Sequence, residues 1–182
     1  MNQYTRHRNT IRLWQLISPS FPVGMFAWSQ GLEYAVEAEW VTNEEQALQW
    51  IQGNLSNNIA YLDAPLLQKM CHAWCEQDNQ SIEYWSHFLL AARESSELVS
   101  EDVQLGKALA KVLIELRIDE AQHWLEFESL NYVMMFSLAV SHWQIPTDEA
   151  VRGYLWGWAE NQVIAAIKLV PLGHLAGQRV LS

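Results

Sequence analysis

Charged residues are scarce in this chain of 182 residues: Asp, Glu, Lys and Arg make up 18 %, below the share of about 25 % that is usual for soluble domains. The charge that is present is mostly negative, and the net charge is −10. A basic surface that would neutralise nucleic-acid phosphates is therefore missing, and the same charge disfavours anionic lipid surfaces. We expect neither nucleic acid nor a membrane as a partner.

Cysteine is also scarce, because the chain holds only Cys71 and Cys75. Two cysteines do not indicate a secreted disulfide scaffold, no signal peptide is recognisable, and no apolar run reaches the length of a membrane span, so we expect a cytoplasmic protein. On a helix the two thiols share a face that suits a soft metal. A structural zinc site needs four ligands, and no two histidines lie four residues apart, so we expect buried thiols and no metal site.

The motifs of common enzymes are absent. The chain has no phosphate-binding G-x-x-x-x-G-K-[ST] loop, no G-x-S-x-G elbow and no H-E-x-x-H. Glu94 with Glu97, and Glu126 with Glu128, are candidate acid–base pairs, but solvated helix faces explain them better. His142 follows the most apolar segment and is predicted to be a hydrogen-bonded core histidine. No catalytic residue and no cofactor is predicted.

Hydrophobic periodicity indicates helices along the whole chain. Apolar residues recur every three to four positions, for example at Leu48, Ile51, Leu55 and Ile59, and no sustained strand-like alternation occurs. The sequence therefore predicts one all-α domain over residues 1–182, a single-domain helical bundle of roughly seven to ten helices.

Capping residues predict where several helices begin. Thr42 to Glu45 is typical of a capping box, and Asp63 with Pro65 opens a helix through Trp74. Asp119, followed by Gln122, is predicted to cap a segment that contains Trp124 and Phe127. Two longer helices follow. Residues 132–143 are apolar nearly all round and predict a central buried helix. Residues 147–170 predict a final long helix, which ends before Pro171.

Two features suggest a surface that meets another protein. Ten tryptophans are unusual for this length, and Trp is favoured at interfaces, so the composition favours an obligate partner or a homodimer. The stretch from residue 16 to residue 33, LISPSFPVGMFAWSQGLE, is apolar yet rich in Pro, Gly and Ser. Its backbone must follow a defined irregular path, so the loop is either buried or reserved for a partner.

This stretch closely resembles the N-terminal signature of UreF-type urease accessory proteins, L-x-S-P-x-x-P-x-G-x-x-x-x-S-Q-G-L-E. Two further blocks resemble the family in the same order. The central block is RESSEL at residues 93–98 with QLG at 104–106. The C-terminal block comprises YLWGW at 154–158, NQV at 161–163, KLVPLG at 168–173 and GQR at 177–179. Together the blocks span nearly the whole chain and are specific.

The resemblance implies an all-helical homodimer that carries no chemistry of its own. It implies a scaffold that bridges a UreD/UreH-type accessory protein and the UreG GTPase and helps deliver nickel to apo-urease. Proteins that act on a GTPase often supply an arginine, but Arg93, Arg152 and Arg179 qualify equally. Members of the family usually continue into a polar tail that docks UreD/UreH, whereas this chain stops at Ser182, so we expect it to lack that tail.

The resemblance also suggests partner-binding residues at two places. The hypothesis names Ser29, Gln30, Gly31, Glu33, Lys168, Pro171, Leu172, Gln178 and Arg179. Lys168 ends an apolar run before Pro171, and either the helix dipole or a partner explains its charge. Arg93 and Glu97 are spaced as a helical ion pair or, if buried, fix helix packing.

A different class of function stays open from the residues alone. The alternative is a helical enzyme or ligand-binding bundle with an apolar pocket lined by Trp, in which Glu94 or His142 acts as the acid–base group.

Overall fold

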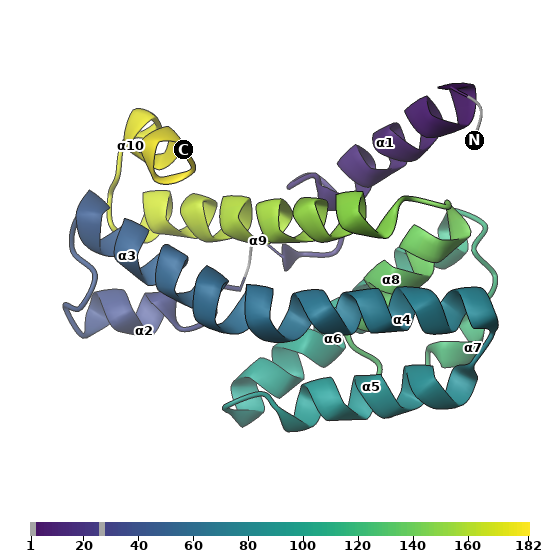
Figure 1. The fold of residues 1–182 in the computed structure, drawn as a ribbon. Helices are drawn as coiled ribbons and strands as arrows, with labels where there is room; N and C mark the ends of the chain where they lie inside the picture. The colour runs from purple at the N-terminus through teal and green to yellow at the C-terminus, as the bar shows by residue number, and fades with distance from the viewer. Residues whose placement is uncertain (1–2, 26–27) are drawn as a thin grey trace.

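A computed structural model describes residues 3–25 and 28–182, and every regular element within these ranges is a helix (Figure 1). The predicted all-α fold is confirmed. Among the residues described, no helix is both long enough and apolar enough to cross a bilayer.

The longest continuous element runs from α3 (Glu44–Asn54) through the π-helical segment η2 (Leu55–Asp63) into α4 (Ala64–Glu76) without leaving helical geometry. Figure 1 shows α3 and α4 as one rod across the molecule. A proline inside an α-helix clashes with the carbonyl four residues earlier, and the π-helical segment lies where the clash of Pro65 falls. The predicted start is confirmed, since α4 begins at Ala64 with Asp63 at its N-cap position and Pro65 in its first turn, but the chain before it is already helical and the Asp63 side chain forms no cap.

Helix α8 (Tyr132–His142) is the centre of the fold, as predicted, and its residues 132–140 are all buried. It packs against α4 and against α6 (Ser96–Glu115). The contact with α6 is close because Gly106 has no side chain: a Cβ there would lie 2.5 Å from the carbonyl carbon of Asn131. Asn131 also caps α8, since its side chain accepts a hydrogen bond from the Met134 amide.

Helix α9 (Thr147–Leu169) lies beside the α3–α4 rod and begins and ends close to the predicted positions. It packs against α1 (Gln3–Ile17), and Gly153 admits the Leu13 side chain to a position 2.8 Å from where a Cβ would stand. It is not the final helix, however, because α10 (His174–Val180) follows and packs on α9 and α3.

The remaining helices are short or peripheral. They are α2 (Leu32–Glu37), α5 (Asn79–Ala91) and α7 (Ala121–Trp124). Helix α5 packs along α4 and α7 packs against α6.

Two predicted caps differ from the structure. The cap of α3 is Asn43, whose Oδ1 accepts from the Gln46 amide, while the Gln46 side chain accepts from the Thr42 amide and hydroxyl. The capping box is therefore shifted by one residue and does not use Glu45. Asp119 does not cap α7, whose N-cap is Glu120 without a side-chain cap bond, and only the backbone carbonyl of Asp119 accepts from the Gln122 amide.

The loop between α1 and α2 is partly buried, as its composition predicted. Phe21 and Val23 belong to the core, and the loop passes along α9. Residues 26 and 27 of the predicted loop lie outside the described ranges.

Candidate functional site

A buried ionic cluster lies at the crossing of four chain segments. The Arg93 guanidinium donates to both oxygens of Asp63, at 2.9 and 3.0 Å, and from Nε to Oδ2 of Asp102 at 2.9 Å, an oxygen that also lies 2.7 Å from Nη2 in the ion pair. The Tyr154 hydroxyl donates to Oδ2 of Asp63 at 2.8 Å. Asp102 also accepts from the Tyr132 amide through its other oxygen. The end of η2, the α5–α6 connection, α6 and α9 are thereby joined.

Ion pairing keeps the Arg93 guanidinium, at the centre of the cluster, charged although it is buried. The Arg93 side chain is only 10 % exposed. Burial opposes its positive charge, but Asp102 and Asp63 together hold the pKa of Arg93 above its usual value. Burial also raises the pKa of Tyr154 well above its usual value, with Asp63 adding to the effect, so the hydroxyl keeps its proton and donates.

The sequence reading of these residues needs correction. Arg93 does not pair with Glu97, which is exposed; the reading of a buried Arg93 that fixes helix packing holds instead. Asp63 does precede α4, but its carboxylate bonds Arg93 and Tyr154 instead of capping the helix, and no prediction from the sequence names Asp102. A signal was present: both carboxylates stand at core spacing, Asp63 between Ile59 and Leu67 and Asp102 before Leu105. A carboxylate on an apolar face needs a cationic partner.

Above the cluster, one side chain holds the α1–α2 loop in place. Gln30 accepts a hydrogen bond from Nε1 of Trp158 at 2.6 Å and donates to Oε1 of Glu101 at 3.0 Å. Gln30 and Gly31 both have positive φ, 49° and 85°, and only glycine adopts the second without strain. Ser29 then accepts from the Glu33 amide in the first turn of α2. The loop conformation is thus set by contacts with α6 and α9.

These residues line a cleft of about 780 Å³. The lining residues come from the α1–α2 loop, from the α5–α6 connection and from helices α2, α3, η2, α6 and α9. They are Trp28, Ser29, Gln30, Gly31, Glu33, Tyr34, Trp50, Asn54, Asn58, Ile59, Arg93, Glu94, Ser95, Glu97, Leu98, Glu101, Asp102, Leu105 and Trp158. The structure therefore brings Ser29, Gln30, Gly31 and Glu33, four of the predicted partner-binding residues, to one concave surface.

The other five predicted residues do not line this cleft. Lys168 is exposed in the last turn of α9, and Pro171 and Leu172 lie in the connection to α10. Gln178 and Arg179 are exposed on α10. Arg179 forms a two-pronged ion pair with Glu44 at the start of α3, with distances of 2.7 and 2.6 Å.

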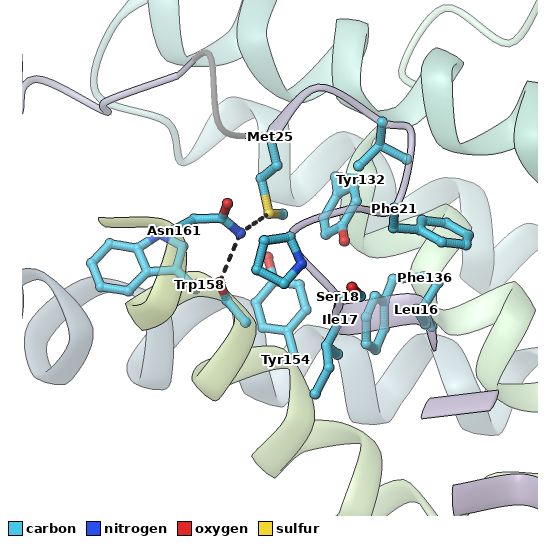
Figure 2. A pocket seen from close by; sticks show the side chains of 13 residues that line it. Leu16, Ile17, Ser18, Phe21, Met25, Tyr132, Phe136, Tyr154, Trp158 and Asn161 are labelled. Carbon is cyan, nitrogen blue, oxygen red and sulfur yellow. Dashed lines mark hydrogen bonds between the residues drawn. The ribbon is translucent and has the colours of Figure 1, made fainter. Parts of the chain in front are cut away.

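A second, much smaller cavity of about 20 Å³ lies beneath the α1–α2 loop (Figure 2). Figure 2 shows Met25 and Asn161 meeting at its edge, where the Asn161 amide nitrogen donates to the Met25 sulfur and to the Gly157 carbonyl. Pockets for small molecules measure about 300–1,000 Å³. This cavity has room for one water-sized group only and does not serve as a ligand pocket.

The solvent exposure of three side chains, Cys71, Cys75 and His142, tests further predictions from the sequence. Cys71 is buried, and burial, with a smaller contribution from Cys75, raises the pKa of its thiol to about 12. Cys75 is exposed, so the expectation of two buried thiols is half wrong. His142 is exposed at the end of α8, which contradicts its prediction as a core histidine. Glu94 lines the cleft but His142 does not.

The described residues contain no group of three His, Cys, Asp or Glu side chains placed to hold a metal ion. Glu94, Glu97, Glu126 and Glu128 are all exposed, as expected, but only Glu97 lies on a helix, because Glu94 is in the α5–α6 connection and Glu126 and Glu128 are in the α7–α8 connection.

Comparison with known proteins shows that this chain is similar to urease accessory proteins. A family model described as UreF matches residues 41–182. The urease accessory protein UreF of Alkalilimnicola ehrlichii is 48 % identical over 170 residues, which cover 93 % of this chain and 75 % of the relative. The proteins of the same name from Hahella chejuensis and Pseudoalteromonas translucida are 43 % and 41 % identical, covering 94 % and 93 % of this chain and 77 % and 73 % of the relatives. The residues matched by the family model include the whole ionic cluster.

Proposed function

Because the chain belongs to the UreF family of urease accessory proteins, we propose that it is a non-catalytic scaffold that bridges a UreD/UreH-type protein and the UreG GTPase. In this role it modulates the GTP-dependent delivery of nickel, the cargo, to apo-urease. The setting we propose is the cytoplasm, which suits its two free thiols.

One observation supports a binding surface more than any other. The loop that presents Ser29, Gly31 and Glu33 is held by the Gln30 side chain, which bonds α6 and α9 at the same time. A surface held in this way loses little freedom when a partner binds, so more of the contact energy appears as affinity. We assign the GTPase contact to this loop together with Lys168.

The scaffold is proposed to act as a homodimer. Several large apolar side chains are exposed, among them Trp14, Trp40 and Trp156, with exposed fractions of 64 %, 59 % and 48 %. Exposed tryptophan is costly in water and is characteristic of interfaces. Light scattering over a wide concentration range tests the dimer, and a monomer throughout would contradict it.

The central experiment is co-purification of this chain with UreD/UreH-type and UreG-type proteins. We expect the chain to retain the GTPase, and we expect Lys168→Ala to weaken that retention while melting within about 2 °C of the wild type, since a helix-terminal Lys contributes only modestly to folding. Lys111 is also an exposed lysine, but it lies on α6. Lys111→Ala is therefore the matched control and should behave as wild type.

Two outcomes contradict parts of this proposal. If Lys168→Ala melts earlier yet retains the GTPase normally, Lys168 is structural. If the wild-type chain retains neither partner, the bridging role fails. The relatives are longer than this chain, so UreD/UreH binding is best measured both for this chain and for a version extended to the relatives' length.

A further inference from the structure

The cleft above the ionic cluster is strongly unbalanced in charge. Its carboxyl groups are those of Glu33, Glu94, Glu97, Glu101 and Asp102. Among the described residues that line it, Arg93 is the single basic one, and its guanidinium is already bonded to Asp63 and Asp102. The remaining carboxylates therefore produce a negative potential inside a concave surface, where the low-dielectric walls concentrate it.

The walls of the cleft are aromatic as well as acidic. Trp28, Tyr34, Trp50 and Trp158 all line it. Aromatic faces attract cations, and they attract arginine in particular because its planar guanidinium also stacks. The same guanidinium donates pairs of parallel hydrogen bonds to carboxylates.

We propose that this cleft receives an arginine side chain from a basic segment of the partner protein. The inference rests on the proposed function, because it makes the cleft a recognition pocket at the surface assigned to the GTPase. The cleft volume of about 780 Å³ accommodates one long side chain with the backbone on either side of it.

Within the cleft, Glu101 is the main anchor for the guanidinium. Glu101 is 5 % exposed, and Gln30 fixes one of its oxygens from the loop side. Glu94 and Glu97 are exposed where the α5–α6 connection leads into α6, and they attract the cation without being desolvated. A desolvated charge contributes more to a complex than one at the rim does.

The raised pKa of Glu101 is what we expect of a buried carboxyl group whose cationic partner has not yet bound. Burial raises its pKa to about 7, and Asp102 adds to this effect, whereas Gln30 and Arg93 oppose it. A cation that enters the cleft favours the carboxylate form. Binding of the arginine is therefore accompanied by loss of a proton and becomes tighter as the pH rises through 7.

The first test uses the guanidinium alone. N-acetyl-arginine amide is titrated into the protein at pH 8 while the tryptophan indole N–H signals are followed by NMR. We expect saturable shifts with a dissociation constant in roughly the millimolar range, and weaker binding of N-acetyl-lysine amide. Shifts that equimolar sodium chloride reproduces, or that do not saturate, would overturn the inference.

The second test uses the GTPase partner and the full chain. Glu101→Gln keeps an oxygen for Gln30, so it preserves the fold while removing the charge. We expect it to weaken GTPase binding at least about tenfold at pH 8 and to abolish the tightening between pH 6 and pH 8. Glu126→Gln, an exposed glutamate outside the cleft, is the matched control and should stay within about twofold of wild type.

The outcomes separate the two proposals. If Glu101→Gln binds the GTPase as wild type does, the arginine pocket is wrong while the scaffold function stands. If the wild-type chain does not bind the GTPase, the scaffold function fails, and the titration with N-acetyl-arginine amide still decides whether the cleft takes a guanidinium.

Discussion

Two arginines of this chain make nearly the same bonds in opposite surroundings. Arg93 and Arg179 each bind a carboxylate with two nitrogens at hydrogen-bond distance. The Arg93 side chain is 10 % exposed and Asp63 is 2 % exposed, whereas Arg179 is 62 % and Glu44 37 % exposed. The contact with one carboxylate is alike, but Arg93 also bonds Asp102, so the two arginines differ in their number of partners as well as in their exposure to water.

Solvent exposure determines how much the loss of each ion pair lowers the stability of the fold. Removing one partner of a buried pair leaves an unpaired charge in a medium of low dielectric, whereas an exposed partner is solvated again at once. The buried cluster also joins segments that are distant in sequence, since Asp63, Arg93 and Tyr154 come from η2, the α5–α6 connection and α9. The exposed pair only fastens α10 to the start of α3.

The largest effect is expected from Arg93→Met. It leaves Asp63 and Asp102 buried without their cation, and we expect the free energy of unfolding to fall by about 3–5 kcal/mol in urea denaturation. A variant that also carries Asp63→Asn and Asp102→Asn should recover part of this loss, because no unpaired charge remains. A loss below about 1 kcal/mol for Arg93→Met would place this pair in the same class as the exposed one.

The next effect concerns the helix contact that holds Asp102 in the cluster. Gly106→Ala places a Cβ against the backbone of Asn131. The next residue, Tyr132, donates its amide hydrogen bond to Asp102. Backbone cannot move as a flexible side chain can, so we expect a loss of about 3 kcal/mol in urea denaturation. Gly53→Ala, where a Cβ meets nothing within 4 Å, is the control and should not destabilise the protein. Equal stability of both variants would contradict the close approach.

A smaller effect, of opposite sign, is expected at the cleft. Because the pKa of Glu101 is raised from 4.5 to about 7 in the fold, its contribution to stability is fully present below pH 4.5 and is lost as the pH rises through 7. Glutamine does not ionise, so Glu101→Gln does not lose stability as the pH rises through 7. We expect it to stabilise the protein by about 1–2 kcal/mol at pH 8 and to change little at pH 5, measured by thermal melts at both pH values. The same gain at both pH values would show that charge is not the cause.

The smallest effect is expected from Arg179→Ala. Its partner Glu44 stays solvated, so the melting temperature should stay within about 2 °C of wild type. Raising the salt concentration should leave this small difference smaller still, because exposed pairs are screened. A fall as large as that of Arg93→Met would contradict the argument from solvent exposure.

Much of the fold could be predicted because helical periodicity and caps are local signals. The buried helix α8 and the bounds of α9 follow from runs of apolar residues and from Pro171. Part of the candidate site could be predicted too, since the loop from Ser29 to Glu33 carries its own turn residues and lines the cleft. The errors at Glu45 and Asp119 arose because several neighbouring polar residues compete for one cap, and the backbone geometry selects among them.

By itself the sequence determined that this protein is helical, acidic and a member of the UreF family, because spacing, composition and local motifs are properties of neighbouring residues. Only the tertiary structure decided that Asp63 pairs with Arg93 instead of capping a helix, and that Glu101 meets Gln30 at the floor of the cleft. These contacts join residues 30 and 71 positions apart. Which carboxylate is buried beside which cation depends on how the helices cross, and no local pattern records that crossing.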